Sequence, residues 1–431
     1  MKYKAVRGTR DIFGDLIEKF KFVEKIAKKI FDMNGFLEIR TPIFENKEVF
    51  IRTLGNEADI VSKEMYDFFD KGNRSLALRP EGTASIVRAV IENNLIQNGI
   101  DKKFYYIGPM FRYDRPQAGR YRQFYQIGVE IFGNKNSFLD AEVISLAVKI
   151  IEQINIHDFV LEINSLGCDE CRENYIKVLQ NYIKNQNSEF CENCKNKIKI
   201  QKNILRIFDC KIENCKKILQ NAPKITDNLC ENCKNYINEV IENLTKINII
   251  NSNNFKINKN LVRGLDYYTG IVFEITTNAL GAQNAICAGG RYDNLVSEFS
   301  KNSVPAIGFA IGEDRVVEIL LQNEKKESSL ATKRTNASSF NKIFFITTNK
   351  EKHREQIFEN YSIIQKLRDN DYIVLYNSEP KSIKSQIRTA DYLKVGFVVF
   401  IEDDETFNLK NMATGEQKKI EKEKIFDFFK I

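Results

Sequence analysis

Apolar and polar positions in the first part of the chain follow the periods of helices and strands. Residues 17–35, IEKFKFVEKIAKKIFDMNG, space their apolar side chains three and four positions apart and stop at Asn-Gly, which predicts an amphipathic helix. Residues 140–154, DAEVISLAVKIIEQI, predict a second helix. Residues 36–45, FLEIRTPIFE, have the character of a strand, and Pro42 within it favours an edge or an interface over a central ladder.

Two further apolar stretches, residues 103–115 and 122–133, predict strands that flank a basic loop, forming a long hairpin. Beyond residue 342, KIFFITT, a helix through Arg368, YIVLYN, SIKSQIRTADYLK and FVVFIED alternate strand and helix, which is typical of a small α/β domain.

Between these patterned regions the composition changes twice. Residues 168–254 are rich in Asn, Lys and Cys and poor in aromatic residues, which indicates an insertion, and residues 322–341 are polar and lack apolar spacing, as linkers do. The expected divisions are a main domain in two parts (1–167 and 255–321), the insertion (168–254), the linker (322–341) and the α/β domain (342–431).

Composition narrows the class of protein. A chain of 431 residues predicts two or three domains, and 43% hydrophobic with 29% charged residues is globular composition. The net charge of +7 suits a polyanionic partner. No apolar run reaches the roughly 18–20 residues of a membrane span, and the start lacks the apolar segment of a secretory signal. We therefore expect a cytoplasmic protein without a membrane segment.

Only two histidines occur, so general-base chemistry by histidine is almost unavailable. Binding, clamping and charge stabilisation are the better expectation for this chain.

Eight of the nine cysteines lie between residues 168 and 233. Because the cytosol keeps thiols reduced, we do not expect these cysteines to form disulfides. The spacing of Cys168, Cys171, Cys191 and Cys194 fits a four-thiolate zinc site. The remaining quartet would form a second site, or the pairs would interleave, and the alternative is a set of reduced, partly buried thiols. That quartet comprises Cys210, Cys215, Cys230 and Cys233.

The predicted hairpin carries a concentration of polar chemistry. Arg112 stands inside the strand between two aromatic residues, where a guanidinium needs a partner such as a phosphate. The loop offers a basic tip suited to nucleic acid, with ordinary surface charge as the alternative. The tip residues are Arg115, Gln117, Arg120 and Arg122.

On the second strand of the hairpin, Gln126, Gly128 and Glu130 alternate and so share one face. They would form a polar pocket floor, with room above the glycine, for an ammonium or an imidazole group. The alternative is the solvated face of an antiparallel sheet.

Residues 78–85, LRPEGTAS, place Glu81 and Thr83 at the start of an apolar helix, where both residue types serve as caps. Glu81 would also bind a substrate amine.

Three more segments carry unusual polar residues. Residues 263–270, RGLDYYTG, put charges and two tyrosines directly before a strand, and residues 288–295, AGGRYDNL, offer a Gly pair that is weak evidence because it also suits a turn. In residues 305–321, a glycine-punctuated strand enters a helix whose first turn holds Arg315 against the helix dipole, which favours an anion nearby. No GxxxxGK[ST] occurs, so a P-loop is excluded.

These segments, in this order, resemble the histidyl-tRNA synthetases, a family of class II aminoacyl-tRNA synthetases. FLEIRTPIFE is similar to class II motif 1, residues 104–133 to motif 2, and GFAIGEDR to motif 3. RGLDYYTG and AGGRYD are similar to the family's histidine signatures, and RGTRDIFG near the N-terminus also fits.

The resemblance implies an α+β fold: an antiparallel sheet of six or seven strands flanked by helices, an inserted small domain and a C-terminal α/β domain that binds the anticodon. It implies activation of L-histidine with ATP and Mg²⁺, transfer to tRNA(His), and a homodimer with motif 1 at its interface.

The resemblance also assigns roles to residues. Arg263 would act at the α-phosphate, Arg112 and Arg315 would clamp ATP, and the hairpin tip would meet the acceptor end of the tRNA. Histidine would be held through its ammonium group by Glu81, Thr83 and Gln126 and through its imidazole by Glu130, Tyr267, Tyr268 and Tyr292.

Two other functions remain as alternatives. Catalytically silent relatives serve as regulatory subunits in histidine biosynthesis, and Arg112, Arg263 and Arg315 argue against that role here. Another class II synthetase is disfavoured by RGLDYYTG and AGGRYD.

Overall fold

The computed structural model describes most of the chain. The described ranges are 3–55, 58–96, 100–117, 119–184, 189–199, 201–210, 212–262, 265, 267–280, 284–326, 342–393, 395–403, 405–429 and 431.

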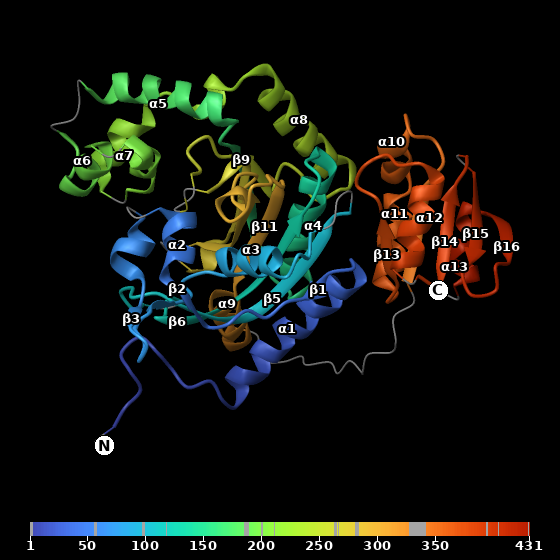
Figure 1. The fold of residues 1–431 in the computed structure, drawn as a ribbon, viewed down its shortest axis with the longest axis horizontal. Helices are drawn as coiled ribbons and strands as arrows, with labels where there is room; N and C mark the ends of the chain where they lie inside the picture. Colours follow the sequence, from blue (N-terminus) through green and yellow to red (C-terminus); the bar gives the residue numbers. More distant parts are fainter. Residues whose placement is uncertain are drawn as a thin grey trace.

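An eight-stranded sheet forms the centre of the N-terminal part, in the order β1-β5-β6-β11-β10-β9-β7-β8 (Figure 1). Its six inner strands are antiparallel, whereas β1 and β8 add to the edges in parallel, which is why the sheet exceeds the six or seven strands expected. The predicted antiparallel sheet flanked by helices is confirmed. The strands are β1 (Leu37–Glu38), β5 (Lys102–Phe111), β6 (Gln123–Phe132), β7 (Val160–Ser165), β8 (Phe255–Ile257), β9 (Thr269–Thr276), β10 (Ala285–Arg291) and β11 (Ala306–Gly312).

Helices cover one face of this sheet, and the alternation along β6 explains which face. Ile127, Val129 and Ile131 point into the main hydrophobic core with residues of α1 (Asp15–Met33), α4 (Ser137–Gln153) and α9 (Glu313–Lys326). The intervening polar residues therefore point to the opposite face. All three helices predicted in the first 160 residues are confirmed, and α1 is followed by its C-cap Asn34 and by Gly35, whose φ is +74°.

The predicted single strand at residues 36–45 is wrong. The segment divides into β1 and β2 (Phe44–Asn46), which belong to different sheets, with Pro42 between them. Proline cannot donate to a ladder and restricts the residue before it, so the chain leaves one sheet there and enters another. The second sheet is small and has the order β2-β4-β3, with β3 (Asp67–Phe69) and β4 (Ser75–Leu78). Along the chain, α2 (Lys47–Leu54) and the π-helical η1 (Ile60–Glu64) lie between β2 and β3, and α3 (Thr83–Glu92) follows β4.

Residues between β7 and β8 form a helical module, drawn in green and yellow-green in Figure 1. None of its described residues adds a strand to the central sheet. Its helices are α5 (Asp169–Lys184), α6 (Glu192–Lys199), η3 (Gln201–Asp209), α7 (Glu213–Gln220), η4 (Ile225–Asn228) and α8 (Glu231–Lys246). Outside the module, short 3-10 turns connect β9 to β10 at η5 (Asn278–Leu280) and β10 to β11 at η6 (Val296–Glu298).

The C-terminal domain is built on a five-stranded sheet in the order β13-β12-β14-β15-β16. Its first three strands are parallel, as the alternation of strand and helix predicts, and β15 and β16 extend it as an antiparallel hairpin. Most of the predicted linker lies outside the described residues, although α9 continues to Lys326. The elements are β12 (Lys342–Thr347), α10 (His353–Glu359), α11 (Tyr361–Asp369), β13 (Ile373–Tyr376), α12 (Ile383–Tyr392), β14 (Phe397–Ile401), β15 (Thr406–Asn411), β16 (Gln417–Glu421), η7 (Lys422–Lys424) and α13 (Ile425–Phe428).

Phe138, in the first turn of α4, joins the two domains. Its ring is 3% exposed and packs edge-on against Phe358 and Tyr361 of the C-terminal domain, with ring centroids 4.6 and 6.1 Å away. A buried ion pair joins Arg368 Nη2 to Glu142 Oε1 at 3.7 Å beside this contact. Phe138 of the sheet domain is thus part of the hydrophobic core of the C-terminal domain.

Across the parts of the chain that the structure describes, no helix combines the length and the apolar character needed to cross a membrane.

Candidate functional site

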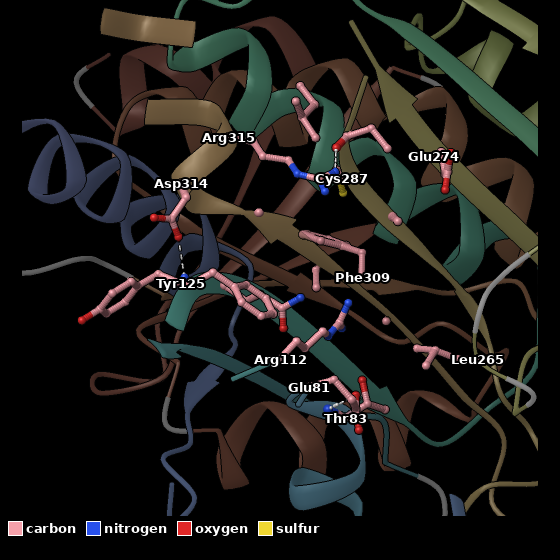
Figure 2. A pocket seen from close by; sticks show the side chains of 18 of the residues that line it. Glu81, Thr83, Arg112, Tyr125, Leu265, Glu274, Cys287, Phe309, Asp314 and Arg315 are labelled. Atoms are coloured by element: carbon pink, nitrogen blue, oxygen red, sulfur yellow. Dashed lines mark hydrogen bonds between the residues drawn. The ribbon is translucent and has the colours of Figure 1, made fainter. Parts of the chain in front are cut away.

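A cavity of about 440 Å³ opens on the face of the central sheet opposite the main core (Figure 2). In Figure 2, Glu81 and Thr83 lie at one end, Arg315 at the other, and Arg112 between them. Arg263 lies outside the described residues. Every other residue predicted for the histidine and ATP sites lines this cavity: Glu81, Thr83, Arg112, Gln126, Glu130, Tyr267, Tyr268, Tyr292 and Arg315.

Glu130 forms part of the cavity floor and is 1% exposed. Its Oε1 accepts a hydrogen bond from Thr83 Oγ1 at 2.6 Å, and its Oε2 accepts one from the hydroxyl of Tyr292. Burial raises the pKa of Glu130 to about 8, while the two hydroxyl donors act in the opposite direction. A carboxyl group in this state is prepared to exchange a proton with a bound basic ring.

Gly128 and Gly82 make room for a tyrosine rather than for a ligand. A Cβ at either position would lie less than 3 Å from the ring of Tyr106, which pairs directly opposite Gly128 in the hairpin. The predicted space above Gly128 is therefore filled by Tyr106, whose side chain becomes part of the cavity wall. Sequence analysis missed Tyr106, although the hairpin register places it opposite the glycine.

Glu81 caps α3, as its position predicted. Its two carboxylate oxygens accept from the backbone N–H groups of Thr83 and Ala84, each at 2.8 Å. Burial raises the pKa of Glu81, and these hydrogen bonds oppose the rise. A carboxylate has about four acceptor positions, so capping leaves Glu81 able to accept from a ligand as well.

Gln126 presents a buried acceptor to the same region. Its Oε1 is buried and has no hydrogen-bond partner among the described residues, and the residue lines the cavity. A buried amide oxygen without a donor is costly, so this atom fits a ligand that carries N–H groups.

Three tyrosines close the side of the cavity nearest Glu130. Tyr267 packs on Tyr268 and on Tyr292, with ring centroids 4.7 and 5.6 Å apart, and all three are at most 8% exposed. Together with Glu130 they form a small compartment of aromatic rings and hydroxyl groups around one carboxyl group.

The cavity is cationic from its middle, at Arg112, to the end that Arg315 lines. Arg112 follows the last residue of β5 rather than lying inside the strand, and its Nε donates to the carbonyl of Pro80 at 2.9 Å. Arg315 Nη1 donates to the carbonyl of Ala285 at 2.5 Å. Burial lowers the pKa of both guanidinium groups, and for Arg315 the nearby Arg120 and Arg112 lower it further. Three arginines that repel one another across a cavity favour a polyanionic ligand.

Arg10, which sequence analysis left without a role, anchors the N-terminal segment here. Its Nη2 donates to Asp314 Oδ1 at 2.7 Å, while Asp314 Oδ2 accepts from the backbone N–H of Tyr125 at 2.6 Å. Asp314 also lines the cavity. The RGTRDIFG segment therefore supports the first turn of α9, and its match to a family signature was the signal available for Arg10.

The four residues predicted at the hairpin tip do not share one surface. Arg115 and Gln117 are exposed, whereas Arg120 lines the cavity in an ion pair with Asp114. Arg122 stacks on the ring of Tyr113 at 3.7 Å and supports the N-terminal segment. Ala118 lies outside the described residues.

The Gly pair of AGGRYD lies inside β10 and is no turn. A Cβ on Gly289 would lie less than 3 Å from the carbonyl oxygen of Gly308 on the neighbouring strand, so close strand approach requires glycine there. Arg291, next in sequence, is fully buried and pairs with Asp140 of α4 at 2.6 Å. Because Asp140 also accepts from Tyr236 of α8 at 2.9 Å, this network joins β10 to two helices.

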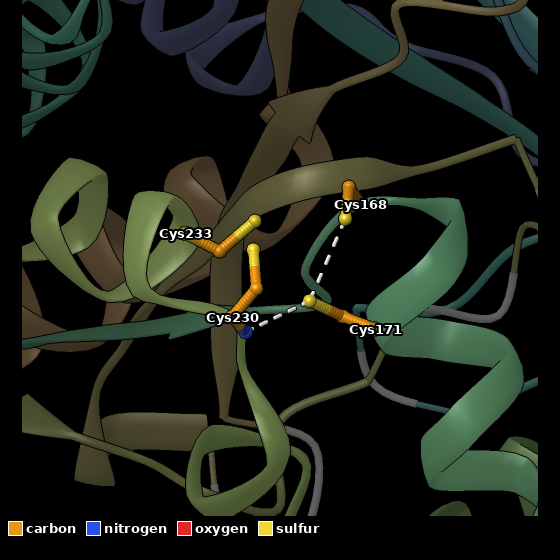
Figure 3. A group of neighbouring side chains, drawn as sticks. All are labelled: Cys168, Cys171, Cys230 and Cys233. Carbon is orange, nitrogen blue, oxygen red and sulfur yellow. Dashed lines mark hydrogen bonds between the residues drawn. The ribbon is translucent and has the colours of Figure 1, made fainter.

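Eight of the nine cysteines form two groups of four, one nested within the other along the chain, and Figure 3 shows the group of Cys168, Cys171, Cys230 and Cys233. The first and last pairs of the sequence meet, and the two middle pairs meet, with the four sulfur atoms of each group within 4.8 Å of one another. The consecutive grouping of Cys168, Cys171, Cys191 and Cys194 is therefore wrong, and the alternative, in which the pairs do not group in consecutive order, is the one observed. The C-x-x-C pairs all suit the same spacing rule, so only the fold selects their partners. We call Cys168, Cys171, Cys230 and Cys233 the outer quartet and Cys191, Cys194, Cys210 and Cys215 the inner quartet.

Neither histidine of the chain lines the cavity. His353 is buried in the C-terminal domain, where its ring nitrogens contact Thr347 Oγ1 at 2.5 Å and the carbonyl of Asn377 at 3.2 Å. The site therefore offers charge and hydrogen bonds and no histidine base.

Two family models match the chain. One, described as histidyl-tRNA synthetase, matches residues 8–316, and one described as anticodon binding domain matches residues 342–430. The chain is 44% identical to a histidine–tRNA ligase of Thermodesulfovibrio yellowstonii over 97% of this chain and 96% of the relative. It is 42% identical to one of Thermosipho melanesiensis over 98% and 97%.

Two solved structures are similar to this chain in fold. An apo histidyl-tRNA synthetase of S. aureus matches with a TM-score of 0.60 and 32% identity, covering 100% of both chains. A protein of Bacillus halodurans described as an ATP phosphoribosyltransferase regulatory subunit/histidyl-tRNA synthetase matches with a TM-score of 0.55 and 20% identity, over 93% and 98%, which shows a shared fold alone.

Proposed function

The chain belongs to the histidyl-tRNA synthetase family, and from that premise we propose how its residues divide the work. Its activity is that of a histidine–tRNA ligase, a class II aminoacyl-tRNA synthetase. It activates L-histidine with ATP to histidyl-adenylate, releasing pyrophosphate, and transfers the histidine to the 3′ end of tRNA(His).

Our assignment of the amino-acid site rests on Gln126 Oε1, which is buried and has no hydrogen-bond partner among the described residues. It accepts one N–H of the substrate α-ammonium, and Glu81 accepts another through the lone pairs that capping leaves free. Thr83 completes this end by holding the carboxyl group of Glu130.

The imidazole ring of the substrate enters the tyrosine compartment, where Glu130 lies between Thr83 and Tyr292. Tyr267 and Tyr268 enclose the ring. An analogue that lacks one ring nitrogen leaves a buried polar group of this compartment unpaired, at a cost of roughly 1–3 kcal/mol per group.

ATP occupies the cationic end as its Mg²⁺ complex, with Arg112 and Arg315 as clamps and Arg263 at the α-phosphate. The histidine carboxylate attacks the α-phosphorus and pyrophosphate leaves, so no general base is required in this step. Positioning and charge neutralisation supply the acceleration. The absence of histidine from the cavity lining supports this mechanism.

In the second step a hydroxyl of the terminal ribose of the tRNA attacks the adenylate. The exposed Arg115 and Gln117 are the tip residues best situated for the acceptor end, and Arg120 faces the cavity. The C-terminal domain meets the anticodon. We expect the reaction in the cytoplasm, in keeping with nine cysteines that form no disulfide.

Histidine-dependent ATP–pyrophosphate exchange without tRNA tests this assignment, compared across the other amino acids. Exchange should occur with histidine alone, and Arg112→Ala and Arg263→Ala should each lower its kcat by about 10²–10³-fold. Gln126→Leu should raise KM for histidine by about tenfold and leave KM for ATP unchanged. Arg354→Ala, a surface change in the C-terminal domain, is the control. Equal exchange by Arg112→Ala and the wild type would refute the clamp.

The functional unit is a homodimer of this chain. Several apolar side chains beside the divided motif 1 segment are exposed, and exposed apolar side chains that gather in one region mark interaction surfaces. They are Leu37 (62% exposed), Ile43 (43%), Phe44 (56%), Phe68 (42%) and Phe69 (69%).

Sedimentation velocity tests the dimer. Wild type should sediment as a dimer, and Phe44→Glu combined with Phe69→Glu should sediment as a monomer, because a charge buried in an apolar interface is costly. Ile383→Glu, at an exposed apolar position of the C-terminal domain, should remain dimeric. A dimeric double variant would locate the interface elsewhere.

A further inference from the structure

The outer and inner cysteine quartets lie in the inserted helical module. The reaction described above does not use them. In each quartet the sulfur atoms contact one another without bonding: Sγ of Cys168 and Cys171 are 3.5 Å apart, and Sγ of Cys191 and Cys210 are 3.9 Å apart. A disulfide requires about 2.05 Å. Four thiols gathered in this way match the ligand set of a closed tetrahedral site, where Zn–S bonds of about 2.3 Å place the sulfurs about 3.8 Å apart.

Each quartet also supplies hydrogen bonds to sulfur. The backbone N–H of Cys230 donates to Cys171 Sγ at 3.0 Å, and that of Cys191 donates to Cys215 Sγ at 3.3 Å. Such donors stabilise thiolates and orient them toward a metal. In both quartets the acceptor is a buried cysteine of the opposite pair, so the two groups repeat one design.

The positions of the three C-x-x-C pairs fit this design. Cys168, Cys191 and Cys230 directly precede α5, α6 and α8, and their C-x-x-C partners lie in the first turn of the same helices. Free N–H groups and the helix dipole favour negative charge at these ends. Short helices such as α6 and α7 bury little apolar surface, and small modules of this kind need cross-links.

The outer quartet lies next to the histidine compartment. Gly167 has φ +68°, and a Cβ there would lie 2.5 Å from Cys171 Cβ, so the chain passes directly against the quartet. Gly167 is in turn paired with the strand that follows the tyrosines: Gly270 N–H donates to its carbonyl at 3.0 Å, and Leu166 N–H donates to Gly270 O at 2.7 Å.

A second link starts from the residue after Cys171. Arg172 Nη1 donates to the backbone carbonyl of Tyr268 at 3.4 Å. The outer quartet is therefore linked through Gly167 and Arg172 to the chain at Tyr268 and Gly270. The inner quartet, built from α6, α7 and the residues between them, contacts neither Tyr267 nor Tyr268 among the described interactions.

We propose that each quartet binds one structural Zn²⁺ ion through four thiolates, and that the outer ion positions the Tyr267–Tyr268 pair for histidine binding. This deepens the proposed function, since it rests on that pair enclosing the imidazole. The inner ion stabilises the tip of the insertion. Four thiolates leave no open coordination position, so neither ion takes part in the reaction.

Metal analysis of the full-length protein, expressed with adequate zinc, tests the sites independently of activity. Wild type should contain two zinc ions per chain, and Cys168→Ser (outer) and Cys210→Ser (inner) should each contain one. Cobalt substitution should give the absorption of tetrahedral thiolate sites. Less than one zinc per chain, or iron in its place, would overturn the metal assignment.

Histidine-dependent exchange then separates the two sites. Cys168→Ser should raise KM for histidine by about tenfold with KM for ATP unchanged, while Cys210→Ser should stay close to wild type. Cys168→His, which preserves a zinc ligand, should restore both the second zinc and KM. Equal KM changes in the two serine variants would refute the positioning role.

Arg172→Gln covers the case in which an outer-site variant fails to fold, because it changes no ligand. It should retain two zinc ions and raise KM for histidine by about 3–10-fold. An unchanged KM would contradict the link through Tyr268. Loss of exchange by the wild type itself would refute the proposed function, whereas the zinc count would still decide the metal sites.

Discussion

Glu130 holds its carboxyl group in the cavity floor, where burial raises its pKa from 4.5 to about 8. The folded protein therefore holds a proton that the unfolded chain releases above pH 4.5. The contribution of Glu130 to stability is full below that pH and is lost as pH rises through about 8. Glu130, the carboxyl group that we assign to histidine recognition, therefore lowers the stability of the folded protein at neutral pH.

Glu130→Gln removes this titration and keeps the shape of the side chain. We expect the free energy of unfolding of the variant, relative to wild type, to rise between pH 5 and pH 9 by a few kcal/mol, since each pKa unit is worth about 1.4 kcal/mol. Urea unfolding at both pH values measures the difference. Parallel pH profiles for the two proteins would show that the pKa of Glu130 is not raised.

At the scale of elements, the hairpin β5–β6 builds the floor by alternation, with Ile127 and Val129 in the core and Gln126 and Glu130 in the cavity. Its register brings Tyr106 against Gly128, with Gly82 close by. The ring is enclosed by backbone and has little room to move.

Gly128→Ala should therefore push Tyr106 into the cavity. Overpacking of this kind typically costs about 1–3 kcal/mol, and we expect a lower Tm together with a raised KM for histidine. Gly396→Ala is the matched control, because its Cβ would meet only Lys342 O at 3.7 Å. A variant with wild-type KM would show that the ring finds space elsewhere.

Much of this architecture could be predicted from sequence because periodicity is local. The hairpin, α1, α4 and the strand entering α9 follow directly from the spacing of apolar residues. Three features could not, because each depends on contacts distant in sequence. The division of motif 1 at Pro42 needs two sheets, the glycines of β10 need Gly308 opposite them, and the cysteine pairs need the folded insertion to select partners.

At the scale of the whole molecule, Phe138 couples the cavity domain to the C-terminal domain. Its ring lies in the core of that domain although its helix, α4, packs on the central sheet. Lys149 Nζ adds an ion pair to Asp369 at 2.7 Å across the same boundary. Side chains of α4 therefore help to fix the relative placement of the two domains, together with contacts from elsewhere such as Lys29 with Asp371.

Phe138→Ala should loosen this boundary. Removing a buried Phe costs about 3–5 kcal/mol, and we expect tRNA charging to fall by about tenfold because two linked binding surfaces lose their fixed separation. Pyrophosphate exchange, which needs only the cavity, should stay close to wild type. Phe428→Ala, whose ring contacts Phe397 and Phe429 within the C-terminal domain, is the control. An equal loss in both assays would mean that Phe138 supports the cavity itself.

The nesting of the inner cysteine quartet within the outer one has a consequence for the order in which the chain folds as it is synthesised. The inner group closes a loop of 24 residues between Cys191 and Cys215, and the outer group closes one of 59 residues between Cys171 and Cys230. The longer closure costs about 0.8 kcal/mol more in chain entropy, and its last two ligands leave the ribosome after the inner group is complete. Tyr267, Tyr268 and Tyr292 emerge later still. A nascent chain would therefore complete its scaffold from the inside outward, and would add the residues that select the amino acid only when that scaffold can receive them.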